Sequence, residues 1–340
     1  MKNKKLFEID NEVYERYDER NQLFCRTDVD RKYSNYKREI YERNKELIEE
    51  KKPGYTRIDY ALDSAAWTLY ETYKVMPKDM IRGLGYYECY KSLPKYEVED
   101  KKKMSEIIKR VASFFGASLT GITNFDERWV YSYDCNGKKI EIPKEYKYAI
   151  VMGIEMDPVG IASSPSVTSA CATALGYSKM TFLIMHVGEF IRALGYHTIP
   201  MLNDTALSIP LAIQAGLGKL GRNGLLVTDK YGSRVRICKI FTDLPLEIDP
   251  PPDSYILEFC KTCKKCAEAC EADAISFDDE PSFNTQCPEN NPGVKKWYIN
   301  AEKCYDYWYE NGADCATCIT VCPFSGVKEN KPKDFWGMDI

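Results

Sequence analysis

Long apolar runs are absent from this 340-residue sequence, and so is a strong excess of charge of either sign. No stretch reaches about 18 apolar residues, so we expect no transmembrane helix. The formal net charge of −4 argues against a protein that binds nucleic acid or a membrane surface. The N-terminus lacks both an apolar signal region and a twin-arginine pair. The sequence therefore indicates a cytoplasmic protein, or the mature form of an exported one.

Histidine is scarce as well, with 2 residues, whereas cysteine occurs 14 times. In a cytosolic chain so many cysteines are poor candidates for disulfides, and metal binding is the preferred interpretation. Eight of the cysteines form two groups near the C-terminus. The other six are scattered singly, and we expect them to be small buried hydrophobic residues. They are Cys25, Cys89, Cys135, Cys171, Cys238 and Cys287.

Hydrophobic periodicity predicts a chain of mixed helices and strands. Helices are expected over residues 35–52, 106–115, 168–194 and 208–215, and strands over 118–122, 148–155, 196–201, 225–228 and 234–241. Pro245 and the run Pro250, Pro251 and Pro252 exclude a helix and mark a domain boundary. We therefore expect an N-terminal helical and aromatic region (1–115), a cofactor-binding core (116–249) and a cysteine-rich domain (250–340).

The two C-terminal cysteine groups have the spacing of bacterial ferredoxins that bind two [4Fe–4S] clusters. Cys260, Cys263, Cys266 and Cys270 follow C-x2-C-x2-C-x3-C, and Cys315, Cys318 and Cys322 follow C-x2-C-x3-C-P. In such runs the fourth cysteine binds the other cluster. We therefore assign Cys260, Cys263, Cys266 and Cys322 to a first cluster, and Cys270, Cys304, Cys315 and Cys318 to a second. Zinc is the alternative, but its usual C-x2-C pairs lack the third close cysteine.

The motifs also depart from the bacterial pattern. Glu271 follows Cys270 where that pattern has proline. The second run lacks its first cysteine at the usual place, and we expect Cys304, eleven residues before Cys315, to replace it. Cys287 competes for this role.

Roughly 250 residues precede the cysteine runs, which is more than one typical domain. Clusters transfer electrons but bind no small substrate, so this part is expected to hold a second cofactor. Gly216, Gly218 and Gly221 match the dinucleotide fingerprint G-x-G-x-x-G. That fingerprint follows a strand and opens a helix, whereas here a helix precedes it and an extended segment follows. We therefore expect these glycines to allow the close approach of another large planar cofactor.

Several motifs together resemble those of corrinoid-dependent reductive dehalogenases. They are FEID (7–10), EFIRALGY (189–196), NDT (203–205), AGLG (215–218), GRNGL (221–225), YG (231–232), RVRICK (234–239), FTDLP (241–245), KKWYI (295–299) and KC (303–304). The resemblance implies an α+β fold, with a nitroreductase-like α/β core that binds cobalamin base-off and a ferredoxin-like domain with two [4Fe–4S] clusters. The chain has no D-x-H-x-x-G motif, so neither His186 nor His197 is expected to ligate cobalt.

The resemblance also implies a catalytic group. The family's proton donor aligns with Tyr177, its partner arginine with Arg236 and a third polar residue with Asn203. A cation beside a phenol favours the phenolate and so eases proton release. Arg234 is a rival for Arg236, because alternate strand residues share a face, and Asn203 could instead form a turn or cap. We expect cobalamin contacts from Thr173, Thr205, Ser208, Gly218, Gly221, Ile237 and Thr242.

The expected activity is reductive dehalogenation, in which Co(I) cobalamin reduced by the clusters removes halide from an organohalide and Tyr177 supplies the proton. A ferredoxin, flavodoxin or reductase of low potential is the expected electron donor, and no nucleic acid is expected. One alternative is an enzyme similar to epoxyqueuosine reductase acting on tRNA. It is disfavoured because that family carries an acidic donor and a C-terminal helical extension, and because the chain has no basic excess. The other alternative is a non-catalytic electron carrier or corrinoid-reducing protein.

Overall fold

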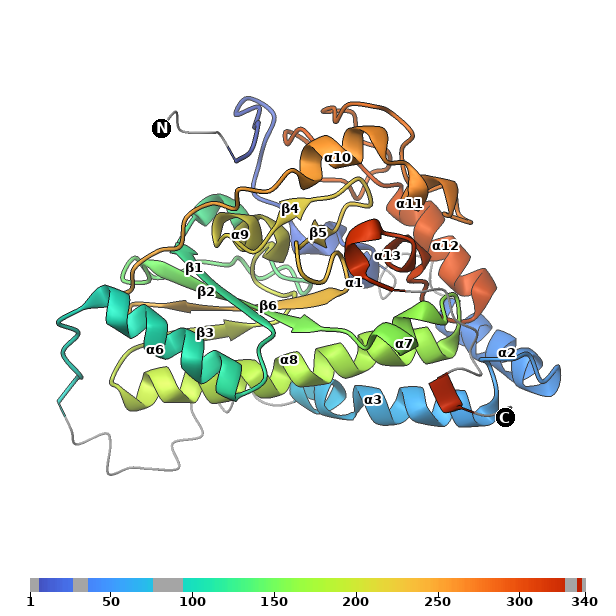
Figure 1. Ribbon diagram of the computed structural model, residues 1–340, viewed down its shortest axis with the longest axis horizontal. Helices are drawn as coiled ribbons and strands as arrows, with labels where there is room; N and C mark the ends of the chain where they lie inside the picture. Colours follow the sequence, from blue (N-terminus) through green and yellow to red (C-terminus); the bar gives the residue numbers. More distant parts are fainter. Residues whose placement is uncertain (1–5, 27–35, 76–93, 328–334, 338–340) are drawn as a thin grey trace.

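The computed structural model describes residues 6–26, 36–75, 94–327 and 335–337. Its centre is a four-stranded sheet with the order β1-β2-β6-β3, in which all pairings are antiparallel (Figure 1). The strands are β1 (Leu119–Asn124), β2 (Tyr148–Glu155), β3 (Thr198–Met201), β4 (Lys219–Leu220), β5 (Leu226–Val227) and β6 (Val235–Thr242). The helices are α1 (Leu23–Arg26), α2 (Tyr36–Glu49), α3 (Arg57–Val75), α6 (Lys101–Phe114), α7 (Pro158–Ala162), α8 (Val167–Ala193), α9 (Ser208–Gln214), α10 (Ile256–Thr262), α11 (Lys265–Glu268), α12 (Ala301–Asn311) and α13 (Thr317–Thr320).

Side chains of the central strands alternate between two apolar layers. On β6, Cys238 and Ile240 belong to the layer that includes α6 and α8, whereas Ile237 and Phe241 belong to the layer that includes α9. The same alternation directs Arg236 toward α8, where its guanidinium lies beside a helix side chain. The sheet therefore separates the two faces of the region that carries the candidate site.

Helix α8 is 27 residues long and runs along one face of the sheet, with α3 beside it (Figure 1). Its first turn is capped by Ser166, whose side chain accepts a hydrogen bond from the N–H of Ser169 at 3.3 Å. The helix predicted over residues 168–194 is thus confirmed. Helix α6 begins at Lys101, earlier than the predicted residue 106, because the Asp100 side chain caps it by accepting from the N–H of Lys103.

The C-terminal elements α10 to α13 gather above the sheet in Figure 1, with α13 packed against α7. Strand β5 pairs with β4 rather than with β6, so the two predicted strands on either side of Tyr231 belong to different sheets. Helix α9 does precede the glycine-rich segment, as the sequence predicts; β4 lies within that segment, and the extended β5 follows it after a turn. Among the described residues no helix has the length and apolar character needed to cross a membrane.

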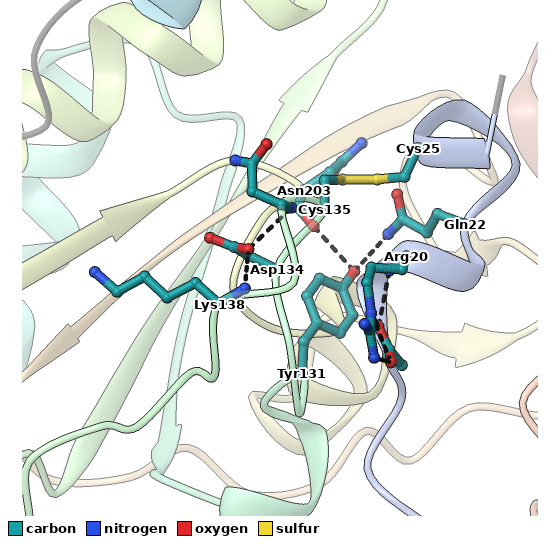
Figure 2. Close-up of a disulfide and its surroundings, with 10 residues drawn as sticks. Arg20, Gln22, Cys25, Tyr131, Asp134, Cys135, Lys138 and Asn203 are labelled. Carbon is teal, nitrogen blue, oxygen red and sulfur yellow. Dashed lines mark hydrogen bonds and ion pairs between the residues drawn. A yellow bond between two sulfur atoms is a disulfide. The ribbon is translucent and has the colours of Figure 1, made fainter. Parts of the chain in front are cut away.

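One expectation about the scattered cysteines is wrong. Cys25 and Cys135 form a disulfide that joins α1 to the loop before β2, with a Cα–Cα distance of 5.5 Å (Figure 2). The two residues are 110 positions apart, so neither spacing nor local pattern reveals the pair. Cys171 and Cys238 are buried as expected, and Cys89 lies outside the described residues.

Candidate active site

Three polar side chains that lie far apart in the sequence meet at one end of the sheet. Tyr177 projects from α8, Asn203 lies in the turn after β3, and Arg236 lies on β6. The Asn203 Nδ2 atom donates a hydrogen bond to the Tyr177 hydroxyl at 2.6 Å. The Arg236 guanidinium lies over the Tyr177 ring, with its Cζ atom 5.2 Å from the ring centroid. The structure thus brings together all three residues that the resemblance implies.

The hydrogen-bond direction matters for the chemistry of Tyr177. A phenol can both accept and donate a hydrogen bond. Because Asn203 donates to the phenolic oxygen, the hydroxyl proton is left for another acceptor, and a phenolate would keep this stabilising contact. Tyr177 is half-buried and Asn203 is exposed, so the hydroxyl remains reachable.

The two arginines of β6 have different surroundings. Arg234 is 5 % exposed, pairs with the Glu155 carboxylate at 2.6 Å and also donates to the Ser325 carbonyl. Within the described part of the chain Arg236 forms no ion pair with a carboxylate. Its Nε contacts the Met156 sulfur at 3.3 Å and its Nη2 contacts the Thr173 hydroxyl at 3.4 Å. Arg236 therefore forms no direct ion pair, although its charge acts on the buried Asp314 carboxyl, whereas Arg234 is paired directly with Glu155.

The turn that carries Asn203 is held in place by two side chains, which donate hydrogen bonds to three successive backbone carbonyl oxygens. The Lys239 ammonium donates to the carbonyl oxygens of Leu202 at 2.5 Å and Asp204 at 3.2 Å. The Tyr131 hydroxyl donates to the carbonyl oxygen of Asn203 at 3.0 Å, and Figure 2 shows this contact close to the disulfide. Lys239 is fully buried, and burial lowers its pKa to about 8. Nothing in the sequence pattern marks Lys239 or Tyr131 for this role.

Aromatic rings cover Tyr177 on its other side. Trp67 stacks on Tyr177 with a centroid distance of 5.3 Å, and Tyr70 lies 5.0 Å away. Burial, followed by the nearby Asp314, raises the pKa of Asp63 to about 7, while a hydrogen bond with Trp67 opposes this shift. Trp67 thus contacts the candidate donor directly.

A cavity of about 560 Å³ lies beside α3 and α8, and none of Tyr177, Asn203 and Arg236 is among its lining residues. Met156, which contacts Arg236, is also one of its lining residues. Most of the lining is apolar and comes from α3 and α8, with Glu155, Asp157 and Lys179 as the charged members. A cavity of this size and character suits a small apolar molecule.

Three of the residues expected to contact cobalamin lie beside Arg236 or in the segment after Asn203. Thr173 lies beside Arg236, and its hydroxyl also contacts the Met156 sulfur at 3.8 Å. Thr205 and Ser208 follow the Asn203 turn, where Thr205 adopts a left-handed φ of 69° and the Ser208 hydroxyl accepts from Lys239 at 3.0 Å. Thr173 thus contacts Arg236 directly, whereas Thr205 and Ser208 belong to the segment that carries Asn203.

The other expected contacts lie further away or are already used by the fold. A Cβ at Gly218 would lie 2.2 Å from the carbonyl oxygen of Val227, so packing of the chain itself requires glycine there. Gly221 lines the cavity of the first cysteine group, and Ile237 is buried in the layer of α9. Thr242 is at the far end of β6 and donates its hydroxyl to the His197 carbonyl. The structure does not bring Thr242 to the candidate site.

The side-chain chemistry fits a corrinoid held without a histidine ligand. The His186 ring stacks on Phe182 with a centroid distance of 3.9 Å, and its Nδ1 is bonded to the Phe182 carbonyl. The His197 Nδ1 is paired with Asp243 at 3.1 Å. Both histidines of the chain thus have partners away from Tyr177. The polar groups around Tyr177 leave a cation and a proton donor for whatever is bound there.

The first four cysteines, Cys260, Cys263, Cys266 and Cys322, line a single cavity, together with residues of the glycine-rich segment. Two of them come from α10 and its C-cap, one from α11, and the last from the chain after α13. Cys322, 56 or more residues beyond the other three, is thus brought to the same cavity, as the ferredoxin spacing predicts.

The second four cysteines also lie within one another's electrostatic field. Burial, followed by the thiols of Cys315 and Cys270, raises the pKa of Cys304 to about 12. Burial, followed by the thiols of Cys315, Cys304, Cys266 and Cys270, likewise raises the pKa of Cys318, with Cys266 the one member of the first set among them. Cys287 points elsewhere, because its sulfur accepts from the N–H of Ala301 at 3.3 Å and contacts the carbonyl of Ile299. The geometry therefore favours Cys304 over Cys287.

The spacing of the sulfur atoms distinguishes clusters from zinc. Thiolates bound to one zinc ion lie about 4 Å apart, since each Zn–S bond is about 2.3 Å. Among the described residues, no three of these eight sulfur atoms lie within 4.8 Å of one another. The described cysteines of these two groups thus do not form the compact triad of a single zinc ion.

Comparison with known proteins agrees with this geometry. Residues 259–326 match the model of the 4Fe-4S dicluster domain family. The chain is 37% identical over 289 residues to a tetrachloroethene reductive dehalogenase of Desulfitobacterium hafniense, which covers 72% of this chain and 51% of that protein. It is 31% identical over 315 residues to the tetrachloroethene reductive dehalogenase of Sulfurospirillum multivorans, covering 81% and 63%. An epoxyqueuosine reductase of Bacillus subtilis is 30% identical over only 149 residues, or 39% of this chain.

Solved structures show the same fold. A catabolic reductive dehalogenase in complex with 3-bromo-4-hydroxybenzoic acid aligns with a TM-score of 0.71 and 22% identity over 95% of this chain and 43% of that one. A second reductive dehalogenase, described in connection with B12-dependent dehalogenation, aligns with a TM-score of 0.59 and 27% identity over 70% of this chain and 34% of that one.

The relatives that align over most of this chain are named reductive dehalogenases, and its cysteine-rich part matches a 4Fe-4S dicluster domain. The chain is therefore similar to reductive dehalogenases, a family that binds a corrinoid and two iron–sulfur clusters, over 72% to 81% of its own length. The chain spans about half the length of the Desulfitobacterium relative and somewhat more of the Sulfurospirillum one.

Proposed function

We propose that this chain catalyses the reductive removal of halide from an organohalide. The observation that supports this most strongly is the contact of Asn203 with the Tyr177 hydroxyl under an unpaired arginine. An electron carrier without substrate chemistry has no use for such a group. When bound, a corrinoid supplies a strongly reducing centre beside the carbon–halogen bond, and the clusters supply it with electrons.

The roles of the side chains follow from their contacts. Replacing halide by hydrogen consumes two electrons and one proton, and Tyr177 is the group placed to give that proton. Arg236 lowers the energy of the phenolate left behind, because its charge lies over the ring and forms no direct ion pair with a described carboxylate. Asn203 orients the phenolic oxygen and keeps its hydrogen bond after the proton has left.

The substrate is proposed to bind within reach of the Tyr177 hydroxyl. The mostly apolar cavity that Met156 lines is a candidate place for a halocarbon, and Tyr177 is not among its lining residues. Two of the relatives are named for tetrachloroethene, so a small chlorinated alkene is the first substrate to test. A low-potential ferredoxin, flavodoxin or reductase is the proposed electron donor. The cluster ligands are proposed to be the two sets of cysteines that the structure groups together.

The test is turnover by protein reconstituted anaerobically with iron, sulfide and cobalamin, using reduced methyl viologen and tetrachloroethene. Chloride release and the dechlorinated product are measured together. The proposal predicts chloride release that requires cobalamin. Protein that holds both clusters and cobalamin but releases no halide from chlorinated or brominated, aliphatic or aromatic substrates would contradict it.

A further inference from the structure

Arg222 extends from the glycine-rich segment of the core into the first cysteine run. Its side chain is 1 % exposed. All of its hydrogen bonds end on backbone carbonyl oxygens, namely those of Cys260, Lys261, Cys263, Ser276 and Asp278, at 2.6 to 3.2 Å. The Trp297 ring covers one face of the guanidinium, with Cζ 4.8 Å from its centroid. A buried cation thus joins the core to the loop that carries two proposed cluster ligands.

The charge of Arg222 is not balanced by a carboxylate. Within the described residues it forms no ion pair. The Asp279 carboxylate, whose pKa is lowered first by Lys264 and then by Arg222, has a 78% exposed side chain and is paired with Lys264 at 2.7 Å. Lys261, in the same run, is likewise paired with Glu258 and Glu280. Solvent and partners therefore screen the lysine charges, whereas the charge of Arg222 acts in a buried environment.

This charge lies next to the proposed position of the first cluster. Arg222 lines the same cavity as Cys260, Cys263, Cys266 and Cys322. Reduction of a cluster adds one electron and breaks no bond, so it makes the cluster more negative by one charge. A nearby buried cation stabilises that added charge, and cluster charge and hydrogen bonding are among the factors that set the reduction potential.

We propose that the unpaired positive charge of Arg222 raises the reduction potential of the cluster held by Cys260, Cys263, Cys266 and Cys322. The electron comes from a low-potential reductant, which is dithionite in the test below. The proposal depends on the cluster domain and not on dehalogenation, so it stands or fails separately from the proposed function.

The experiment is a redox titration monitored by electron paramagnetic resonance on cluster-reconstituted protein, without any organohalide. Three variants separate charge from packing. Arg222→Lys keeps the charge, Arg222→Gln keeps a donor without the charge, and Arg222→Met keeps neither. For Arg222→Gln and Arg222→Met, reduction of one cluster should become about tenfold less favourable, which is a midpoint about 59 mV lower for one electron. The other cluster should not change, and Arg222→Lys should stay close to the unaltered protein.

The matched control is another buried arginine that joins the core to the cysteine-rich domain. It is removed together with the carboxylate that balances its charge. Arg234 donates to the Ser325 carbonyl, three residues beyond Cys322, and pairs with Glu155. The double variant Arg234→Gln with Glu155→Gln changes no net charge, so both midpoints should remain in place. A shift as large as that of Arg222→Gln would mean that packing at this contact, not charge, sets the potential.

Each remaining outcome also decides the matter. Unchanged midpoints in Arg222→Gln overturn the proposal, and so does an equal shift in Arg222→Lys. If the neutral variants lose only the first cluster, seen as about half the iron, while Arg222→Lys retains it, the requirement for positive charge is supported. If Arg222→Lys loses it too, the role of Arg222 is structural and the proposal fails.

Discussion

Replacing Tyr177 by phenylalanine removes one oxygen atom and leaves the ring in place. The ring contacts with Trp67 at 5.3 Å and Tyr70 at 5.0 Å do not need the hydroxyl. What is lost is the hydrogen bond from Asn203 and the proton that the phenol would give. A positioned general acid contributes about 10² to 10⁴ in rate. We therefore expect kcat to fall by at least about a hundredfold, or about 2.7 kcal/mol.

The effect on folding should be much smaller. The hydroxyl is half-buried and makes one neutral hydrogen bond, so the free energy of unfolding should fall by about 1 kcal/mol or less. Halide release is measured on protein with matched iron and cobalt content, and KM is measured with it. Tyr148→Phe is the control, because the Tyr148 hydroxyl has only a 3.4 Å contact with Lys101. A Tyr177→Phe protein with full cofactors and a kcat within about twofold of the parent would refute the assignment of the donor.

Three further predictions follow from the same structure. Cys304→Ser should reduce the iron content by about half, whereas Cys287→Ser should retain both clusters; the reverse result would exchange the two assignments. Gly176→Ala should lower kcat by about tenfold or more while the cofactor content stays normal. The new Cβ would lie 2.8 Å from the Cγ of Arg236 and would displace the arginine side chain. An unchanged kcat would show that catalysis does not require Arg236 at this position. Burial raises the pKa of Glu19 from 4.5 to about 7. The protein should therefore lose about 3 kcal/mol of folding stability as pH rises through that interval, and Glu19→Gln should remove this dependence. If the unfolding midpoint of Glu19→Gln follows the same pH profile as that of the parent protein, the prediction is contradicted.

The elements of the fold follow closely from the sequence pattern. The buried strand predicted over residues 148–155 coincides with β2, and the long helix over 168–194 differs from α8 by one residue at each end. Apolar periodicity sets these elements because burial on the sheet faces is what stabilises them. The pairing of β5 with β4 was not predicted, because strand pairing depends on tertiary packing rather than on local pattern.

The candidate site, too, could be predicted from the sequence only in part. Cysteine spacing predicts which four cysteines line each site, because the ferredoxin loop is a local structure with fixed spacing. The contact between Tyr177 and Asn203 joins a helix to a turn 26 residues later, and only the resemblance indicated it. Lys239, Arg222 and Tyr131 were missed as supports, because an ordinary buried lysine, arginine or tyrosine has no spacing signal. The Cys25 disulfide was missed for the same reason.

The central claim is that electrons pass through the iron–sulfur domain and a corrinoid to an organohalide. The most direct test is chloride released from tetrachloroethene per electron taken from reduced viologen, compared in cluster-loaded protein with and without cobalamin. The account predicts one chloride for every two electrons, and none when cobalamin is left out. Equal chloride release in the two samples, or viologen oxidation without any chloride in the loaded protein, would contradict it.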